Sequence, residues 1–150
     1  MKRIVLIMTV SAALTACSNS MASLQEKAER TATEFAEAYF NYDLTKASTL
    51  VTPESVKWIS FVASNISEED IEVLNTRSEG ATVTLDDCEM INDTTCEAVI
   101  TVDNFMAIDT IGRPGVFRHD GTFRLTVVLR DGRWLIKMAS LPQNETRSHD

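Results

Sequence analysis

Apolar residues recur at three- and four-residue spacing from Leu24 to Phe40, with most of the charged residues falling between them. Such spacing places one apolar stripe along an α-helix. Ser23 and Glu26 have the spacing of a capping box, so we expect this helix to begin at Ser23. The residues of the stripe are Leu24, Ala28, Ala32, Phe35, Ala36, Tyr39 and Phe40. The pattern predicts a helix with an aromatic-rich face packed on the core.

Two shorter helices are predicted next. Asp43 is a suitable N-cap for a helix that ends near Val51. Pro53 suits the first position of a third helix. The apolar side of that helix comprises Val56, Ile59, Val62 and Ala63. Trp58 and Phe61 lie off this side, so either the helix is packed on two sides or these two side chains line a cavity.

From Ile71 onward the apolar pattern changes from helical to alternating. Helices followed by strands predict an α+β domain rather than a βαβ repeat. The first three expected strands are Ile71–Asn75, Ala81–Leu85 and Cys96–Val102, the last two joined around Ile91–Asp93. Pairing Leu85 with Ile100 and Val83 with Val102 keeps the apolar residues on one face. This register requires a β-bulge near Asp86-Asp87.

A final hairpin is predicted around Asp131-Gly132, a two-residue turn of the kind that needs positive φ. The expected pairs are Leu129 with Trp134, Val127 with Ile136, Leu125 with Met138 and Phe123 with Ser140. Residues 110–120 are expected to form a long loop, and Pro142 to Asp150 a frayed polar tail.

The N-terminal end begins with Lys2 and Arg3, followed by an apolar run from Ile4 to Leu14. This order is typical of a secretory signal, and the run is too short to span a membrane. The stretch Leu14-Thr15-Ala16-Cys17 resembles the bacterial lipobox. That resemblance implies cleavage after Ala16, acylation of Cys17 and, because Ser18 follows, sorting to the outer membrane. The alternative is an ordinary signal peptide that happens to carry a cysteine near its cut.

These boundaries divide the chain into a signal peptide (1–16), an acylated cysteine with a short tether (17–22), one domain (23–141) and the polar tail (142–150). Removing residues 1–16 from the 150-residue chain leaves 134 residues, which suits a single domain. The net charge then changes from −8 to −10, because Lys2 and Arg3 are the only charged residues among those removed. Such a balance argues against a nucleic-acid partner, so the lipid on Cys17 is expected to contact the bilayer.

Cys88 and Cys96 are the remaining cysteines, and an exported compartment permits a disulfide between them. Closing so short a loop stabilises the fold by roughly 2.5 kcal/mol. A metal site is the rival interpretation, but zinc needs further ligands. The chain offers only His119 and His149 as histidines.

The order of three helices, an antiparallel sheet and the hairpin Arg130-Asp131-Gly132-Arg133-Trp134 resembles the nuclear-transport-factor-two-like family, in particular its small bacterial lipoproteins of unknown function. The resemblance covers residues 23–141. It implies N-terminal helices packed on a strongly curved antiparallel sheet that forms a cone. Relatives use the cavity of the cone to bind small ligands, to dock partners or, less often, for catalysis.

Four aromatic residues are candidates to line this cavity: Tyr39, Trp58, Phe61 and Trp134. Packing in the core is the alternative for each residue on an apolar stripe. Enzymes of this fold place acids, tyrosines or histidines in the cone, where burial shifts a pKa. Here Asp103, Asp109 and Asp120 are expected in solvated turns, and His119-Asp120-Gly121 is expected to be a turn.

The acids Asp86, Asp87 and Glu89 have two interpretations, a calcium site or a charged sheet edge. The sequence contains no phosphate-binding loop, nucleophile elbow or His-Glu-x-x-His pair, and no cofactor or metal is expected.

Three functions remain. The first is a non-enzymatic, outer-membrane-anchored periplasmic lipoprotein whose cone binds a small apolar ligand or an envelope protein. The second is an interaction module whose exposed sheet face, with Arg124, Val128 and Arg130, forms a homodimer or docks an envelope protein. The third is an enzyme that uses Tyr39 with one of the loop acids.

Overall fold

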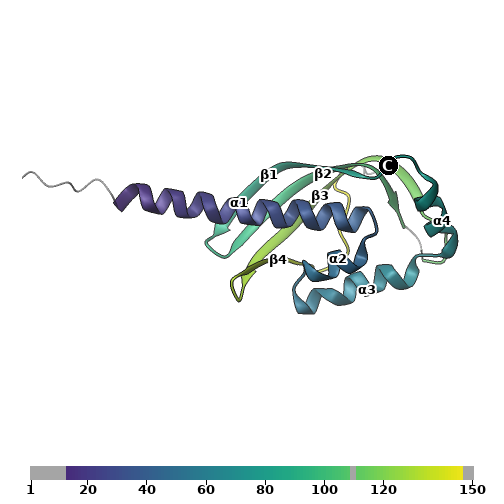
Figure 1. Cartoon of the computed structure of the whole chain (residues 1–150), viewed down its shortest axis with the longest axis horizontal. Coiled ribbons are helices and arrows are strands. Elements are labelled where there is room, and N and C mark those ends of the chain that lie inside the picture. The colour runs from purple at the N-terminus through teal and green to yellow at the C-terminus, as the bar shows by residue number, and fades with distance from the viewer. Residues whose placement is uncertain (1–12, 109–110, 147–150) are drawn as a thin grey trace, which may run out of the picture.

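The computed structural model describes residues 13–108 and 111–146, with side chains from residue 20 onward. In this part of the chain, helices come first and an antiparallel sheet follows (Figure 1). The helices are α1 (Ala13–Phe40), α2 (Leu44–Thr49), the 3-10 turn η1 (Pro53–Ser55), α3 (Val56–Asn65) and α4 (Glu68–Thr76). The strands are β1 (Thr82–Asn92), β2 (Thr95–Ala107), β3 (Val116–Arg130) and β4 (Arg133–Lys137). The predicted α+β class is confirmed.

Helix α1 begins at Ala13 rather than at Ser23, so the predicted capping box at Ser23 is wrong. Residues 13–22 contain no glycine or proline and include leucine, methionine and alanine, which favour helix. The helix therefore continues through Ser23, and the backbone of the predicted tether, residues 17–22, is helical. The first turns of α1 project beyond the sheet in Figure 1.

The two short helices lie where the sequence predicts them. The Asp43 carboxylate accepts a hydrogen bond from the Lys46 amide (3.1 Å) and caps α2, as expected. Pro53 opens η1, which leads directly into α3. The Ser55 hydroxyl accepts a hydrogen bond from the Met138 amide (2.8 Å), so this turn is fastened to the residue that follows β4.

Helix α4 occupies the segment where a first strand was predicted, so the predicted strand Ile71–Asn75 is wrong. A capping box starts the helix: Ser67 Oγ accepts from the Asp70 amide (3.1 Å), and Asp70 Oδ2 accepts from the Ser67 amide (3.0 Å). Three acidic residues in the first turn also stabilise the helix, because their negative charges interact favourably with the positive end of the helix dipole. These local signals outweigh a two-residue alternation of Ile71 and Val73.

The four strands form one antiparallel sheet in the order β1-β2-β3-β4. Leu85 pairs with Ile100, and the register shifts between Leu85 and Asp87, so the predicted pairing and bulge are confirmed. Cys88 and Cys96 form the predicted disulfide across β1 and β2, with their Cα atoms 6.4 Å apart.

The β3–β4 hairpin is confirmed near its turn and wrong farther from it. Leu129 pairs with Trp134, and Asp131 and Gly132 both have positive φ (49° and 77°). Strand β4 ends at Lys137, so the predicted partners Met138 and Ser140 do not pair with β3. The Met138 amide bonds to Ser55 instead, which turns the chain away from the sheet. At the other end β3 begins at Val116, so residues 116–120 are strand rather than loop.

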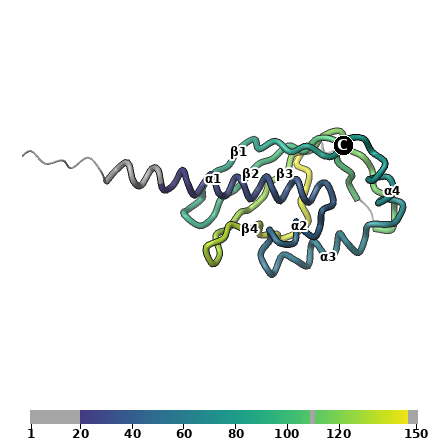
Figure 2. The backbone as a smooth tube through the Cα atoms, viewed as in Figure 1, coloured from purple at the N-terminus to yellow at the C-terminus, as the bar shows by residue number. Residues whose placement is uncertain are grey.

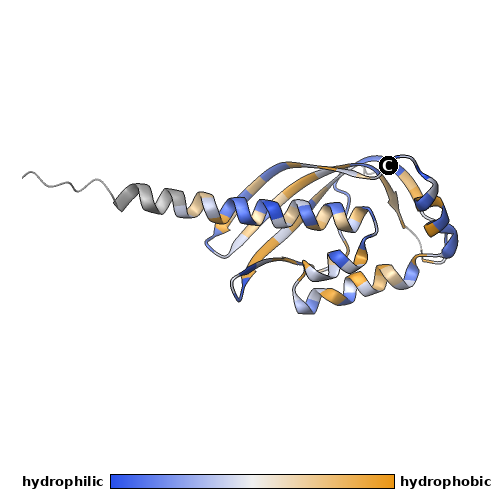
Figure 3. Ribbon diagram, in the orientation of Figure 1, coloured by the Kyte–Doolittle hydropathy of each residue, from blue (hydrophilic) through white to orange (hydrophobic). Residues whose placement is uncertain are grey.

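The core lies between α1 and the sheet, and α1 contacts all four strands. Phe35 on α1, Ile100 on β2 and Val127 on β3 have no exposed surface. Figure 3 shows polar and apolar residues alternating along the strands, as expected for a sheet with one buried face. Ala28, Ala32, Phe35, Ala36 and Phe40 of the predicted stripe are buried, and Tyr39 is half-buried.

Candidate functional site

A pocket of about 650 Å³ opens between the end of α1, helix α3, and the far ends of β2 and β3. Residues 141–146, here called the C-terminal segment, complete its wall. This volume falls within the range of about 300–1,000 Å³ that is typical of small-molecule sites.

Four aromatic rings from three elements form the apolar floor of the pocket. Phe40 of α1 packs against Phe123 of β3 and Phe105 of β2, with ring centroids 4.6 and 5.4 Å apart. Phe105 and Phe123 meet edge to face at 5.5 Å. Tyr39 contacts Phe40 edge to face at 5.1 Å. Because Phe40, Phe105 and Phe123 are buried to 95% or more, the floor is part of the core and is fixed in place.

A bend in β2 directs residues into this pocket. Asn104 has positive φ (55°), a conformation that asparagine tolerates better than most residues. The side-chain nitrogen Nδ2 of Asn104 lies 3.3 Å from the Glu79 carbonyl oxygen and 3.4 Å from the Gly80 carbonyl oxygen. The alternation of buried and exposed residues breaks here, so both Phe105 and Met106 are buried. The far ends of β2 and β3 curl at this end of the sheet (Figure 1).

Tyr39 lines the pocket, as the sequence suggested. Its ring stacks on Phe35 with centroids 5.4 Å apart. Within the described residues no group hydrogen-bonds its hydroxyl, whereas the Tyr42 hydroxyl donates to the Met106 carbonyl (2.8 Å). Burial raises the pKa of Tyr39 above its ordinary value, and nearby Tyr42 adds to this effect. Tyr39 therefore offers the pocket a neutral hydroxyl that can donate or accept a hydrogen bond.

The other three predicted lining residues divide between the pocket and the core. Phe61 of α3 lies at the pocket and is 39% exposed. Trp134 is 7% exposed and packs in the main core, away from the pocket. Trp58 is half-buried against the same core, and its indole N–H is buried without a partner in the described part of the chain. The pocket thus brings together Tyr39 and Phe61 but not the two tryptophans.

The C-terminal segment is docked, so the expectation of a frayed tail is wrong for residues 142–146. The Glu145 amide donates to the Thr122 carbonyl (2.8 Å), and Asn144 Oδ1 accepts from the Thr122 amide (3.1 Å). The segment supplies Leu141, Pro142 and Asn144 to the pocket wall. Sequence reasoning missed it because polar composition alone does not reveal backbone pairing. The remaining residues of the predicted tail, including His149, lie outside the described residues.

Among the described residues, the predicted acids Asp103 and Asp120 do not form a buried catalytic group. His119 and Asp120 lie in β3 rather than in a turn, which corrects the sequence prediction. Their side chains are 98% and 65% exposed, and His119 Nδ1 lies 3.9 Å from Asp120 Oδ1. Asp103 is half-buried in β2, and Asp109 lies outside the described residues. Asp120 lines the pocket, but at this exposure it is a solvated rim carboxylate.

The acidic cluster on β1 lies on the exposed side of the sheet edge. Asp86, at the bulge, accepts a hydrogen bond from the Thr101 hydroxyl (2.6 Å). Over residues 13–108 and 111–146, no three histidine, cysteine, aspartate or glutamate side chains gather in a way that could hold a metal ion.

Two arginines on the outer sheet face are engaged within the chain. Arg130 donates to the Glu54 carboxylate (2.7 Å), and this hydrogen bond is the main cause that lowers the pKa of Glu54 to about 2. Arg124 Nε donates to Glu145 in the C-terminal segment (3.1 Å). Both were predicted as contact residues for a partner, and both are held by intrachain ion pairs. Val128 on the same face is half-buried.

The predicted lipidation residue, Cys17, lies in the backbone of α1, and its side chain is outside the described residues. The signal-peptide prediction falls largely on residues 1–12, which are also outside them. No helix in the described part of the chain has the length and apolar character needed to cross a membrane.

Comparisons with known proteins returned structural similarity only. No family model matches the chain. The comparison with curated proteins found no match either. An NTF-2 like protein of unknown function from Shewanella oneidensis MR-1 shares 17% identity over 80% of this chain and 93% of that one, with a TM-score of 0.45. An Ntf2 like protein involved in plasmid conjugation shares 12% identity over 85% of this chain, with a TM-score of 0.41. This chain spans about half of that second protein, 51% of its length.

Proposed function

We propose that this chain is a binding protein that holds a small, largely apolar ligand in the pocket at the end of α1. The observation that carries the proposal is the aromatic floor of Tyr39, Phe40, Phe105 and Phe123 beneath an open mouth. Apolar surface that enters such a site is removed from water, which contributes about 25 cal/mol per Å².

The polar groups of the pocket support a ligand with an apolar body and one hydrogen-bonding group. The Tyr39 hydroxyl has no protein partner in the described chain and stays neutral at physiological pH. Asn65 and Gln143 lie at the pocket and offer further donors and acceptors. Because the pocket holds no buried pair of nucleophile and base among the described residues, its geometry favours binding over catalysis.

A fluorescence titration with the neutral apolar dye phenylnaphthylamine tests this proposal. The full-length chain carrying Cys17→Ser serves for solution work, because it cannot be acylated at that residue. We expect saturable binding at one site. Ala107→Trp, which places a large side chain in the pocket, should abolish it. Ala63→Trp is the matched control, because Ala63 is exposed on α3 and does not line the pocket. Equal dye binding by the two variants would contradict the proposal.

We also propose that Cys17 is acylated and anchors the protein to the outer membrane, facing the periplasm. The support is the Leu14–Cys17 motif after a short apolar run. Residues 17–22 rise about 9 Å as a helix, at about 1.5 Å per residue, so the domain would lie close to the bilayer. Metabolic labelling with an alkynyl fatty acid tests the anchor. Label should be incorporated in the natural chain and lost in Cys17→Ser; equal label in both would rule out this site.

Pairing of two copies, or docking of an envelope protein, through the outer sheet face remains a prediction. Sedimentation of the Cys17→Ser chain measures its oligomeric state, and a monomer at all concentrations would exclude the homodimer.

A further inference from the structure

The C-terminal segment returns from β4 to the middle of β3 and lies against that strand (Figure 2). Two hydrogen bonds pair it with Thr122: one from the Glu145 amide (2.8 Å) and one from the Thr122 amide to Asn144 Oδ1 (3.1 Å). Asn144 Oδ1 also accepts from the amide and hydroxyl of Thr146 (3.0 and 2.6 Å). The side chain of Asn144 therefore shapes this segment and attaches it to the sheet.

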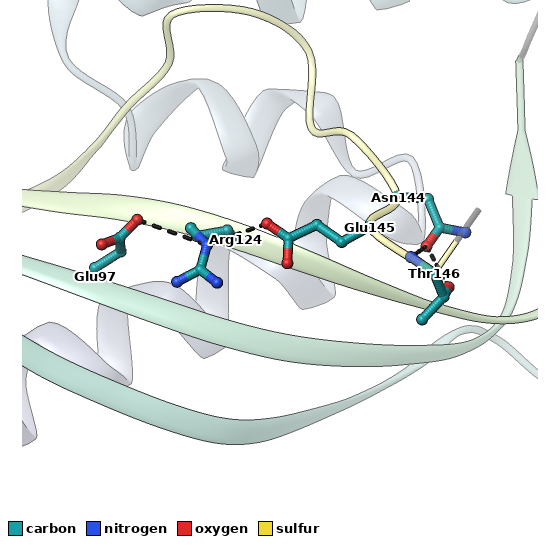
Figure 4. Close-up of polar contacts among 5 residues, drawn as sticks. All are labelled: Glu97, Arg124, Asn144, Glu145 and Thr146. Carbon is teal, nitrogen blue, oxygen red and sulfur yellow. Dashed lines mark hydrogen bonds and ion pairs between the residues drawn. The ribbon is translucent and has the colours of Figure 1, made fainter. Parts of the chain in front are cut away.

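An ion pair on the outer face is the second attachment (Figure 4). Arg124 Nε lies 3.1 Å from Glu145 Oε1 and 3.7 Å from Glu97 Oε1. The side chains of Arg124 and Glu145 are 47% and 43% exposed. Because water competes for both partners, an exposed ion pair of this kind is weak and sensitive to salt.

Gly121 of β3 lets the C-terminal segment approach the strand closely. It is buried, and a Cβ atom there would lie 2.8 Å from Asn144 Nδ2 and 3.0 Å from Phe123 Cε2. A larger residue at this position would therefore press on both the Asn144 side chain and the Phe123 ring.

The pocket walls thus differ in how firmly they are held. The floor is fixed by rings buried in the core, whereas the C-terminal segment is attached by a few polar contacts that are exposed or only partly buried. Segments with few buried contacts are the first to open locally.

We propose that the C-terminal segment is a strap that detaches from β3 to let the ligand enter and leave the pocket. Arg124 is the residue that positions this strap. This inference rests on the proposed binding function. Detachment removes the wall formed by Leu141, Pro142 and Asn144 and leaves the aromatic floor intact.

Stopped-flow measurement of phenylnaphthylamine binding tests this role. Arg124→Gln and Glu145→Gln should each raise the association and dissociation rate constants about two- to fivefold, as expected for an exposed ion pair. The double variant should add little to either single one. High salt should raise both rate constants of the parent chain but not those of the variants, since the dye is neutral. Glu89→Gln, an exposed change on β1, is the matched control and should leave both unchanged.

Gly121→Ala provides a test that does not depend on charge. It should raise the association rate constant and speed hydrogen exchange at the Thr122 and Glu145 amides. If the segment is only a fixed wall, these substitutions should change the dissociation rate constant alone. An unchanged association rate constant in all three single variants therefore overturns the strap. Absence of dye binding by the parent chain would instead overturn the binding function itself.

Discussion

The Asp70 carboxylate of α4 accepts a hydrogen bond from the Gly115 amide (2.8 Å), which joins two segments 45 residues apart. Asp70 is only 2% exposed, and its second oxygen accepts from the amide and hydroxyl of Ser67. One buried carboxylate therefore caps α4 and attaches it to the loop before β3. Burial alone would raise the pKa of Asp70, but these hydrogen bonds outweigh it and lower the pKa.

Asp70→Asn should lower the free energy of unfolding at pH 7 by about 1–3 kcal/mol, because a charged acceptor for buried amides is lost. The folded pKa lies below the unfolded one, so the stabilisation is present above about pH 4 and is lost as the pH falls through the folded pKa. Thermal unfolding between pH 7 and pH 3 measures both effects. Glu69→Gln, in the same helical turn but exposed, is the control. A pH dependence that Asp70→Asn leaves unaltered would contradict this role.

Tyr39→Phe should change the free energy of unfolding at pH 7 by less than about 1 kcal/mol, because its hydroxyl has no partner in the described chain. Burial raises the pKa of the Tyr39 hydroxyl in the folded protein. The stabilisation that the neutral hydroxyl allows is therefore present below about pH 10 and is lost at higher pH. The variant should therefore resist alkaline unfolding better than the parent. Tyr42→Phe is the contrasting control, because it loses the bond to Met106 and should be less stable already at pH 7.

Trp134→Ala should lower the free energy of unfolding by about 3–5 kcal/mol, because the side chain is buried in the main core and its loss leaves a cavity. Lys137→Ala, exposed on the same strand, is the control. Urea denaturation measures both variants. A loss below about 1 kcal/mol in Trp134→Ala would show that this face of the hairpin is assigned wrongly.

Replacing both Cys88 and Cys96 by alanine should lower the free energy of unfolding by about 2–3 kcal/mol, since the short loop between them is freed in the unfolded chain. Urea denaturation with and without reductant is the measurement. The variant should be insensitive to reductant, and equal stability of oxidised and reduced parent protein would contradict the prediction.

The sheet was largely predictable because the alternation of apolar residues restricts which pairings of its strands keep one face apolar. Leu85 and Ile100 face each other only with a bulge at Asp86, and the turn at Asp131-Gly132 fixes the last register. The helix α4 was mispredicted because Ile71 and Val73 alternate over too few residues to decide. The Ser67–Asp70 capping box was the stronger signal.

The pocket was only partly predictable. Periodicity placed Tyr39 on an inward face and Phe61 off one, and both line the pocket. It could not separate Tyr39 from Trp134, since both face the interior and only Tyr39 reaches the pocket. The bend at Asn104 and the docking of the C-terminal segment leave no hydrophobic pattern, because both depend on backbone and polar hydrogen bonds.

The most direct test of the binding pocket is a map of amide chemical shifts in the nitrogen-15-labelled Cys17→Ser chain as phenylnaphthylamine is added. We expect the largest changes at Val62, Phe105, Ala107 and Phe123, with little change at Thr84 and Val99 on the outer sheet face. Changes concentrated on the outer face, or no changes at all, would contradict it.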